Sequence, residues 1–177
     1  MLGFNVRDVL ITIALALVIF LALQAMFQSV KVIGSSMEPS LEQGQYLVVS
    51  KAAYWFHSPR RGDVIVFNPP QDPDHELIKR VIATPGEIVE IRDGKVYIND
   101  QPLEEDYILE APNYRFPPQR VPDGRYLVLG DNRNHSSDSH IWVDPWLPEE
   151  NVIGKAVLSY WPPSMWQCAP NHSLAEE

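Results

Sequence analysis

The sequence has one cysteine, Cys168, and no excess of basic residues, since its formal net charge is −9 at pH 7. A single cysteine cannot form an internal disulfide, so no covalent cross-link within the chain stabilises the fold. An acidic chain without a basic patch cannot neutralise a row of phosphate groups, and nucleic acid is therefore not an expected partner. The 177 residues are enough for one main folded unit.

Long helical patterns are scarce after the first apolar segment. The sequence has 16 prolines, several of them in pairs, and prolines break helices while favouring short strands joined by turns. Stretches rich in β-branched and aromatic residues alternate with turn signals; they are residues 46–51, 63–67, 77–83 and 125–130. This pattern predicts a mainly β fold built on an antiparallel sheet.

A β-hairpin is predicted around Asp93-Gly94, a strong signal for a two-residue turn. Val89 and Ile91 can face two apolar residues of the following stretch across this turn. Residues 101–123 are rich in proline and acidic residues, and we expect an excursion with little regular structure there. Together they would form a reduced cap on the main sheet, over residues 87–123 or so.

An apolar run precedes the β-rich part and predicts a transmembrane helix over residues 9–28. Between Val9 and Phe27 its polar members are Thr12 and Gln24. A cleavable secretion signal and the core helix of a soluble protein are the alternatives, but the run exceeds a usual signal core and lacks small residues at its end. We expect a short cytoplasmic tail at 1–8 and a β-rich domain at 29–177 across the membrane, although the positive-inside signal is weak.

Three polar stretches could carry chemistry. Residues 34–41 place Ser36 in a loop with glycine and proline, close to the predicted membrane exit. In residues 77–83, strand alternation places Lys79 among apolar neighbours, where burial would lower its pKa and let the neutral amine act as a base. Residues 130–140 form a dense polar loop after a predicted strand.

Two other chemistries use the same stretches. His135, Asp138 and His140 are permitted zinc ligands, but their spacing fits no familiar zinc motif. A serine–histidine–aspartate triad could combine Ser36 with His75, His135 or His140, because triads assemble from distant positions. Sequence spacing does not exclude the triad.

Four motifs in order give a family resemblance. The apolar segment, SMEPSL at 36–41, RGDVIVF at 61–67, LIKRVIATPGE at 77–87 and GDNRNHSSDSH at 130–140 resemble type I signal peptidases, also called leader peptidases. The resemblance implies a membrane-bound serine endopeptidase that cleaves signal peptides from translocated preproteins. It would need no metal or organic cofactor, and its partners would be preproteins and the lipid bilayer of a bacterial plasma membrane or thylakoid.

The resemblance also implies residue roles. Ser36 matches the nucleophile and Lys79 the general base, while Ser136 matches a hydroxyl that orients the lysine. Asp131 and Asp138 match residues that brace the site, and Arg80 would pair with Asp131. His140 stands where many bacterial members carry arginine, which resembles the cyanobacterial and thylakoid branch.

Substrate binding is expected along an extended strand beside residues 31–35 and 77–79. Shallow apolar pockets would then select small side chains, and the candidates to line them are Val32, Met37, Leu41 and Ile78. Gly34 falls where some members carry an oxyanion-stabilising serine, so the backbone N–H of Ser36 would have to do more of that work.

Two questions stay open from the sequence alone. A membrane-tethered β-domain that binds peptides without cutting them would share the anchor and the hairpin, but it would not need Ser36 paired with Lys79. The tryptophans near the end of the chain suit contact with lipid headgroups and core packing equally well; they are Trp142, Trp146, Trp161 and Trp166.

Overall fold

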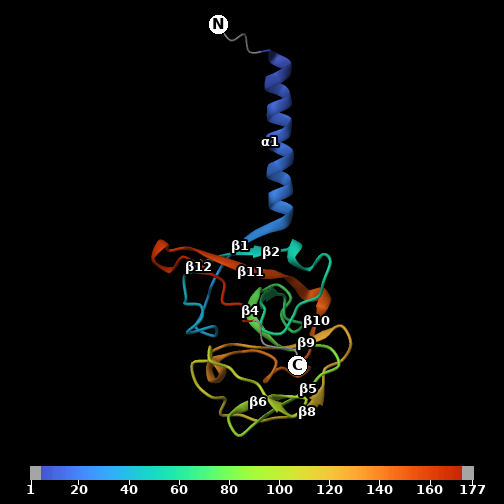
Figure 1. The fold of residues 1–177 in the computed structure, drawn as a ribbon, viewed down its shortest axis with the longest axis vertical. Coiled ribbons are helices and arrows are strands. Elements are labelled where there is room, and N and C mark those ends of the chain that lie inside the picture. The colour runs from blue at the N-terminus through green and yellow to red at the C-terminus, as the bar shows by residue number, and fades with distance from the viewer. Residues whose placement is uncertain (1–4, 173–177) are drawn as a thin grey trace.

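The computed structural model describes residues 5–172 and consists of one long helix above a mostly antiparallel β body (Figure 1). Helix α1 (Val6–Met26) begins after Asn5, whose side chain accepts a hydrogen bond from the N–H of Arg7. None of its residues is buried, and it is long and apolar enough to cross a membrane. It starts and ends slightly earlier than the predicted segment 9–28, because the chain is already extended at Phe27.

Eight strands form the larger sheet, in the order β1-β2-β11-β3-β4-β9-β10, with β12 paired to β11. Their bounds are β1 (Phe27–Lys31), β2 (Tyr46–Ser50), β3 (Val64–Phe67), β4 (Leu77–Ala83), β9 (Arg125–Leu129), β10 (Leu147–Pro148), β11 (Val152–Trp161) and β12 (Gln167–Cys168). All pairings are antiparallel. The four strands expected from composition are confirmed, whereas β1 and the ten-residue β11 were not predicted.

The cap is a second sheet of four strands, in the order β7-β6-β5-β8. Its strands are β5 (Ile88–Arg92), β6 (Lys95–Ile98), β7 (Gln101–Pro102) and β8 (Phe116–Arg120). The predicted hairpin is confirmed, with left-handed backbone at both Asp93 (φ 51°) and Gly94 (φ 76°). The expectation of little regular structure at 101–123 is corrected by β8, whose Pro117-Pro118 is tolerated because β8 lies at the sheet edge.

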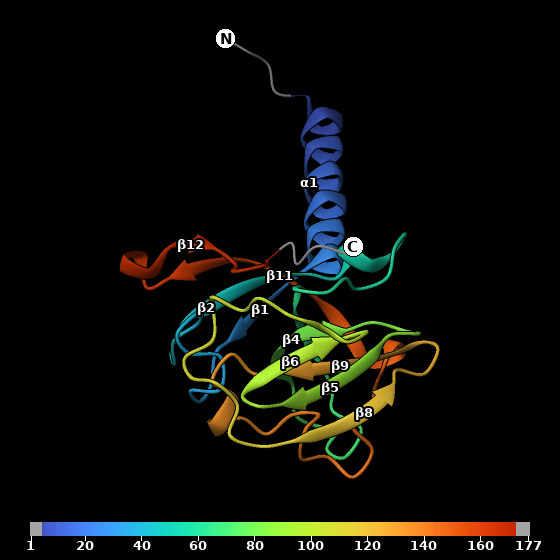
Figure 2. The same cartoon turned by 60° about the horizontal axis from the view of Figure 1, so that its bottom comes forward.

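Three buried apolar clusters hold the body together. One joins the small sheet to β4 and β9, and in Figure 2 strands β5, β6 and β8 lie in front of these two strands. A second cluster lies under β1, β2 and the loop that connects them, and the third lies under β3 and β9. Single turns of 3₁₀-helix complete the connections: η1 (Ala52–Tyr54), η2 (Arg133–His135), η3 (Glu149–Asn151) and η4 (Pro163–Met165).

The four tryptophans near the end of the chain differ in burial: two pack in the core and two are exposed. Trp146 is 9% exposed and belongs to the cluster under the small sheet, and Trp142 packs edge-on against Phe67. Trp161 and Trp166 are exposed, 53% and 68% respectively. Core packing therefore explains the first pair, and only the second pair is free to contact lipid headgroups.

Candidate active site

Ser36, in the loop after β1, and Lys79, in β4, form a hydrogen bond with each other. The Nζ atom of Lys79 lies 2.7 Å from Oγ of Ser36 and donates a second hydrogen bond, of 3.0 Å, to the carbonyl of Ile78. Lys79 is only 3% exposed; it pairs with Ile65 of β3, whereas β4 pairs with β9 only from Arg80 onward. A lysine amine at hydrogen-bond distance from a serine hydroxyl can accept its proton, provided that the amine is neutral.

Burial favours that neutral form. Desolvation lowers the pKa of Lys79 from 10.5 to about 8, against the opposing effect of the Asp138 and Asp131 carboxylates, whose negative charges favour the ammonium. The direction is the one expected from the apolar neighbours of Lys79 in the sequence. A large fraction of the enzyme would thus hold a neutral amine at mildly alkaline pH.

The loop that carries Ser36 is held by Asn132. The backbone N–H of Asn132 donates to the carbonyl of Ser36 at 3.0 Å, and its side-chain amide donates to the carbonyl of Ser35 at 3.2 Å. Gly34 starts the loop with a left-handed backbone (φ 84°), which glycine adopts without strain. Apart from its place in the polar loop, no pattern in the sequence singles out Asn132.

Gly130 lies where the loop that carries Ser36 packs on the polar loop of residues 130–140. A Cβ atom at this position would lie 2.3 Å from Oγ of Ser136 and 2.4 Å from the carbonyl oxygen of Ser36. Real Cβ atoms do not come so close to other atoms, so only glycine fits here. The glycine lets the nucleophile loop pack directly on the polar loop.

Ser136 is buried beside this contact, while the next residue, Ser137, is exposed. Within residues 5–172 its hydroxyl has no hydrogen-bond partner, so the contact with Lys79 implied by the resemblance is not formed. The amine of Lys79 bonds instead to Ser36 and Ile78. The orienting role of Ser136 therefore stays a prediction.

Arg80 and Asp131 form the expected ion pair. Nε and Nη2 of Arg80 donate to the two carboxylate oxygens of Asp131 at 2.8 and 2.5 Å, and both side chains are fully buried. Arg80 also donates to the carbonyls of Gly62 and Pro170, at 3.0 and 2.6 Å. The pair fixes the start of the polar loop against β4, because each of these bonds joins Arg80 to a residue far away in the sequence.

The segment before β8 supports the polar loop from outside. Arg133 donates to both carboxylate oxygens of Glu105, at 2.7 and 2.5 Å, and the ring of Tyr107 lies 4.1 Å from the Arg80 guanidinium. Leu109 donates its N–H to the carbonyl of Asp131 at 3.2 Å. Sequence reasoning missed these residues, because acidic and aromatic residues in a proline-rich excursion show no spacing that links them to a distant loop.

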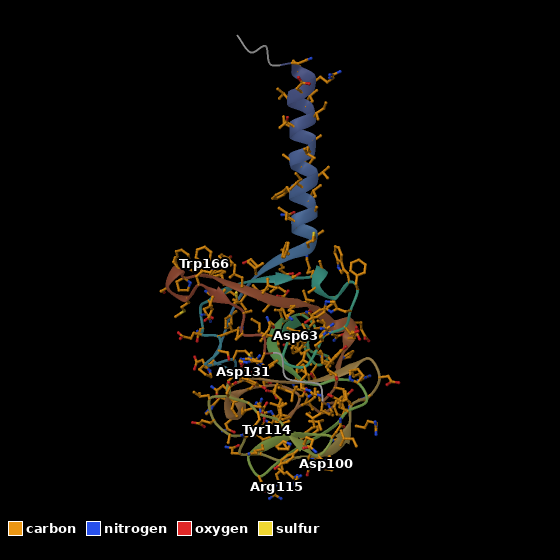
Figure 3. The ribbon with its side chains drawn as sticks, in the orientation of Figure 1. Asp63, Asp100, Tyr114, Arg115, Asp131 and Trp166 are labelled. Carbon is orange, nitrogen blue, oxygen red and sulfur yellow. The ribbon has the colours of Figure 1, made fainter. Side chains whose placement is uncertain are left out.

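Asp138, in the same polar loop, is fully buried. Its Oδ2 accepts a hydrogen bond from the N–H of Gly130 at 2.8 Å, and its Oδ1 lies 2.7 Å from Nδ1 of His140. In Figure 3 Asp131 lies between the foot of α1 and the small sheet, and Tyr114 lies nearer the small sheet. The bracing residues thus occupy the junction of the two sheets.

The histidines do not form the alternative sites. His75 is exposed and bonds to Asp72, His135 is exposed, and His140 bonds to Asp138. In the described part of the chain, no histidine makes a hydrogen bond to Ser36, and no three His, Cys, Asp or Glu residues are grouped as metal ligands would be. The geometry thus favours lysine over histidine as the partner of Ser36.

The four candidate pocket residues belong to one cluster but differ in exposure. Val32, Met37 and Leu41 are 3%, 1% and 0% exposed, and Ile78 packs against them while remaining half-buried. That these four residues line shallow substrate pockets therefore stays a prediction. Met37 and Leu41 support the site from beneath, because they fill the core under the Ser36 loop.

Comparison with known proteins places this arrangement in a family. Residues 6–161 match the family described as signal peptidase, peptidase S26. The chain is 52% identical to a probable signal peptidase I-1 of Synechocystis sp., over 74% of this chain and 69% of that protein. It is 42% identical to thylakoidal processing peptidase 1 of Arabidopsis thaliana, over 73% and 41% of the two chains.

A solved structure of a signal peptidase I from Enterococcus faecalis is 35% identical, with a TM-score of 0.49, and covers 55% of this chain and 95% of its own. The family match extends over most of the chain, from α1 to the end of β11. The chain therefore belongs to the signal peptidase family, peptidase S26, and is a hydrolase of peptide bonds.

Proposed function

We propose that the protein is a membrane-anchored serine endopeptidase that cleaves signal peptides from translocated preproteins, with Ser36 as nucleophile and Lys79 as general base. The observation that carries the proposal is the 2.7 Å contact between Nζ of Lys79 and Oγ of Ser36. A peptide-binding module has no need of a buried lysine whose pKa falls to about 8. Related proteins named as signal peptidases support the choice of substrate.

Two free strand edges beside the dyad suit an extended substrate. Strand β1 is the last strand of the larger sheet, and β4 pairs with β9 only from Arg80 onward. Residues 31–35 and 77–79 can therefore offer backbone groups to a peptide strand between them. Ile78 and Val32 would flank its side chains, and a shallow apolar wall there suits small residues.

In the proposed reaction, neutral Lys79 takes the proton from Ser36 while Oγ attacks the carbonyl carbon of the scissile bond. Lys79 then gives this proton to the leaving amine as the C–N bond breaks, and an ester with Ser36 remains. Water, deprotonated by Lys79, hydrolyses the ester and restores the hydroxyl. Among residues 5–172 the N–H of Ser36 has no backbone acceptor, which leaves it available to stabilise the oxyanion.

The location follows from α1 and from the relatives. We propose that α1 spans the membrane with the preceding tail in the cytoplasm and the β body on the opposite side. Curated relatives include bacterial and thylakoid enzymes, so both membranes suit the proposal. A purified sample in detergent micelles that leaves a signal-peptide-bearing preprotein intact, under conditions where the protein is folded, would contradict the proposed function.

The pH dependence of cleavage tests the base. Because Lys79 must be neutral, kcat/KM should rise with pH through a value of about 8 and then level off. The measurement is a pH profile on a fluorogenic signal-peptide substrate. A profile that climbs only near pH ~10 would show a solvated lysine, and one that climbs near ~6.5 would indicate a histidine base.

Ser136→Ala tests the predicted orienting hydroxyl. We expect kcat/KM to fall by roughly 10- to 1000-fold, because a misdirected amine transfers protons poorly. The melting temperature should hold, since the Ser136 hydroxyl has no hydrogen-bond partner to lose within the described residues. Ser137→Ala, at the exposed neighbour, is the matched control, and a larger loss of activity there would shift the whole loop assignment by one residue.

A further inference from the structure

The imidazole of His140 is held by the polar loop on one side and by the cap on the other. Its Nδ1 lies 2.7 Å from Oδ1 of Asp138, and its backbone N–H donates to the same oxygen at 3.2 Å. The ring stacks on Tyr114, which precedes β8, with centroids 3.9 Å apart and planes 12° apart. With its side chain only 13% exposed, the ring is fixed with Nδ1 toward Asp138.

Asp138 connects this ring to Lys79 electrostatically. Its carboxylate is fully buried, and its negative charge raises the pKa of Lys79 against the larger effect of burial. Its other oxygen is held by the N–H of Gly130 at 2.8 Å. A positive charge beside this carboxylate would weaken its attraction for the ammonium of Lys79, because opposite charges offset each other in a poorly solvated site.

The other charged groups around His140 and Asp138 already form ion pairs. Asp131, which also acts on Lys79, is bound by Arg80 through both oxygens, and Glu105 is bound in the same way by Arg133. Burial raises the pKa of the Tyr114 phenol, so this ring stays neutral. Among the described residues, His140 is the ion-pair partner of Asp138, and imidazole is the side chain that changes charge near neutral pH.

Building on the proposed function of Ser36 and Lys79, we propose that His140 is a positioning residue for the reaction. It fixes the Asp138 carboxylate, and when its imidazole carries a proton it offsets that carboxylate, so that Lys79 gives up its own proton more readily. A positive charge at position 140 would thereby widen the pH range over which Lys79 is neutral.

Two substitutions separate the charge of His140 from its hydrogen bond. His140→Arg places a permanent positive charge beside Asp138 and can stack on Tyr114. His140→Asn keeps a donor where Nδ1 lies but cannot ionise. The full-length proteins, in detergent micelles and labelled with ¹³C at the lysine ε-carbons, are titrated by NMR, with the Lys79 signal identified by its absence in Lys79→Met.

We expect the pKa of Lys79 to be about one pH unit lower in His140→Arg than in His140→Asn, with the unsubstituted protein between them. The acid side of the kcat/KM profile should shift by the same amount. Tyr114→Phe keeps the stacked ring and should leave both measurements unchanged. Should His140→Arg fail to fold, as judged by thermal melting, His140→Lys supplies the same fixed charge.

The two readouts distinguish the possible failures. Equal Lys79 pKa values in the charged variant and His140→Asn would overturn the proposal, even if both variants lost activity, because packing alone would then explain His140. A shifted Lys79 pKa with an unshifted cleavage profile would support the electrostatic coupling, but it would overturn the role of Lys79 as the base.

Discussion

Ser36→Ala and Lys79→Ala are each expected to lower kcat/KM for a preprotein by about 10⁴-fold or more, and the double variant should be no worse than either single one. The reason is the single hydrogen bond between their side chains, 2.7 Å long, through which the proposed proton transfer runs. Removing one member leaves the other without a function. The measurement is cleavage of a preprotein by purified protein in micelles, under single-turnover conditions.

The melting temperature provides an independent check on the role of Lys79. The lowered pKa of Lys79 means that between pH of about 8 and 10.5 the unfolded chain binds more protons than the folded one, so stability rises with pH there. Below that window the buried ammonium costs up to about 3 kcal/mol. Lys79→Met should therefore be inactive and yet melt at the same or a higher temperature at neutral pH.

Neighbouring residues provide matched controls for the dyad. Ser35→Ala changes the exposed residue beside the nucleophile, and Lys95→Ala removes an exposed lysine from β6. Both should keep nearly full activity. Substantial cleavage by folded Lys79→Ala would contradict the dyad and return a histidine to consideration as the base.

Gly130→Ala should lower kcat/KM by about 10²-fold to 10³-fold, although the substitution adds only a methyl group. The new Cβ would lie 2.4 Å from the backbone carbonyl oxygen of Ser36, which already accepts the N–H of Asn132. This clash is relieved only if the loop that carries Ser36 separates from the polar loop, and that movement carries Oγ of Ser36 away from Lys79. Steady-state kinetics and a melting curve on the same sample measure the two effects.

Gly154→Ala is the control for this clash. A Cβ there would lie 2.5 Å from the backbone carbonyl oxygen of Ser50, in the larger sheet and away from the dyad. It should lower the melting temperature while leaving the kcat/KM of the folded protein near normal. The double variant Gly130→Ala/Ser136→Ala removes the hydroxyl clash but not the carbonyl clash, and activity equal to that of Ser136→Ala alone would show that the Ser36 carbonyl is not the obstacle.

Local patterns in the sequence predicted the elements whose stability is local. The Asp93-Gly94 hairpin and strand β4 depend on turn chemistry and alternation, both of which are visible in a few residues. Strand β8 was not predicted, because two prolines argue against a strand unless its edge position in the sheet is known. Such a position is decided by tertiary pairing and leaves no local signal.

Among the residues of the candidate site, too, only those with a local sequence signal could be predicted. Lys79 stood out because a cation sat among apolar residues, and burial is what lowers its pKa. Asn132, Glu105 and Tyr107 did not stand out, because their contacts join residues far apart in the chain. The burial of Met37 and Leu41 was not predicted for a related reason: an apolar residue near a nucleophile fits a pocket wall and a core equally well until the packing of the loop is known.

The direct junction between α1 and β1 has a geometric consequence. Phe27 caps the end of the helix and is also the first residue of a strand in the larger sheet, so no loop separates the helix from the sheet. With α1 in a bilayer, this direct connection would hold the β body, and Ser36 with it, at a fixed distance from the lipid. In the proposed reaction, the distance between the end of a signal peptide's apolar segment and the cleavage site would then be fixed.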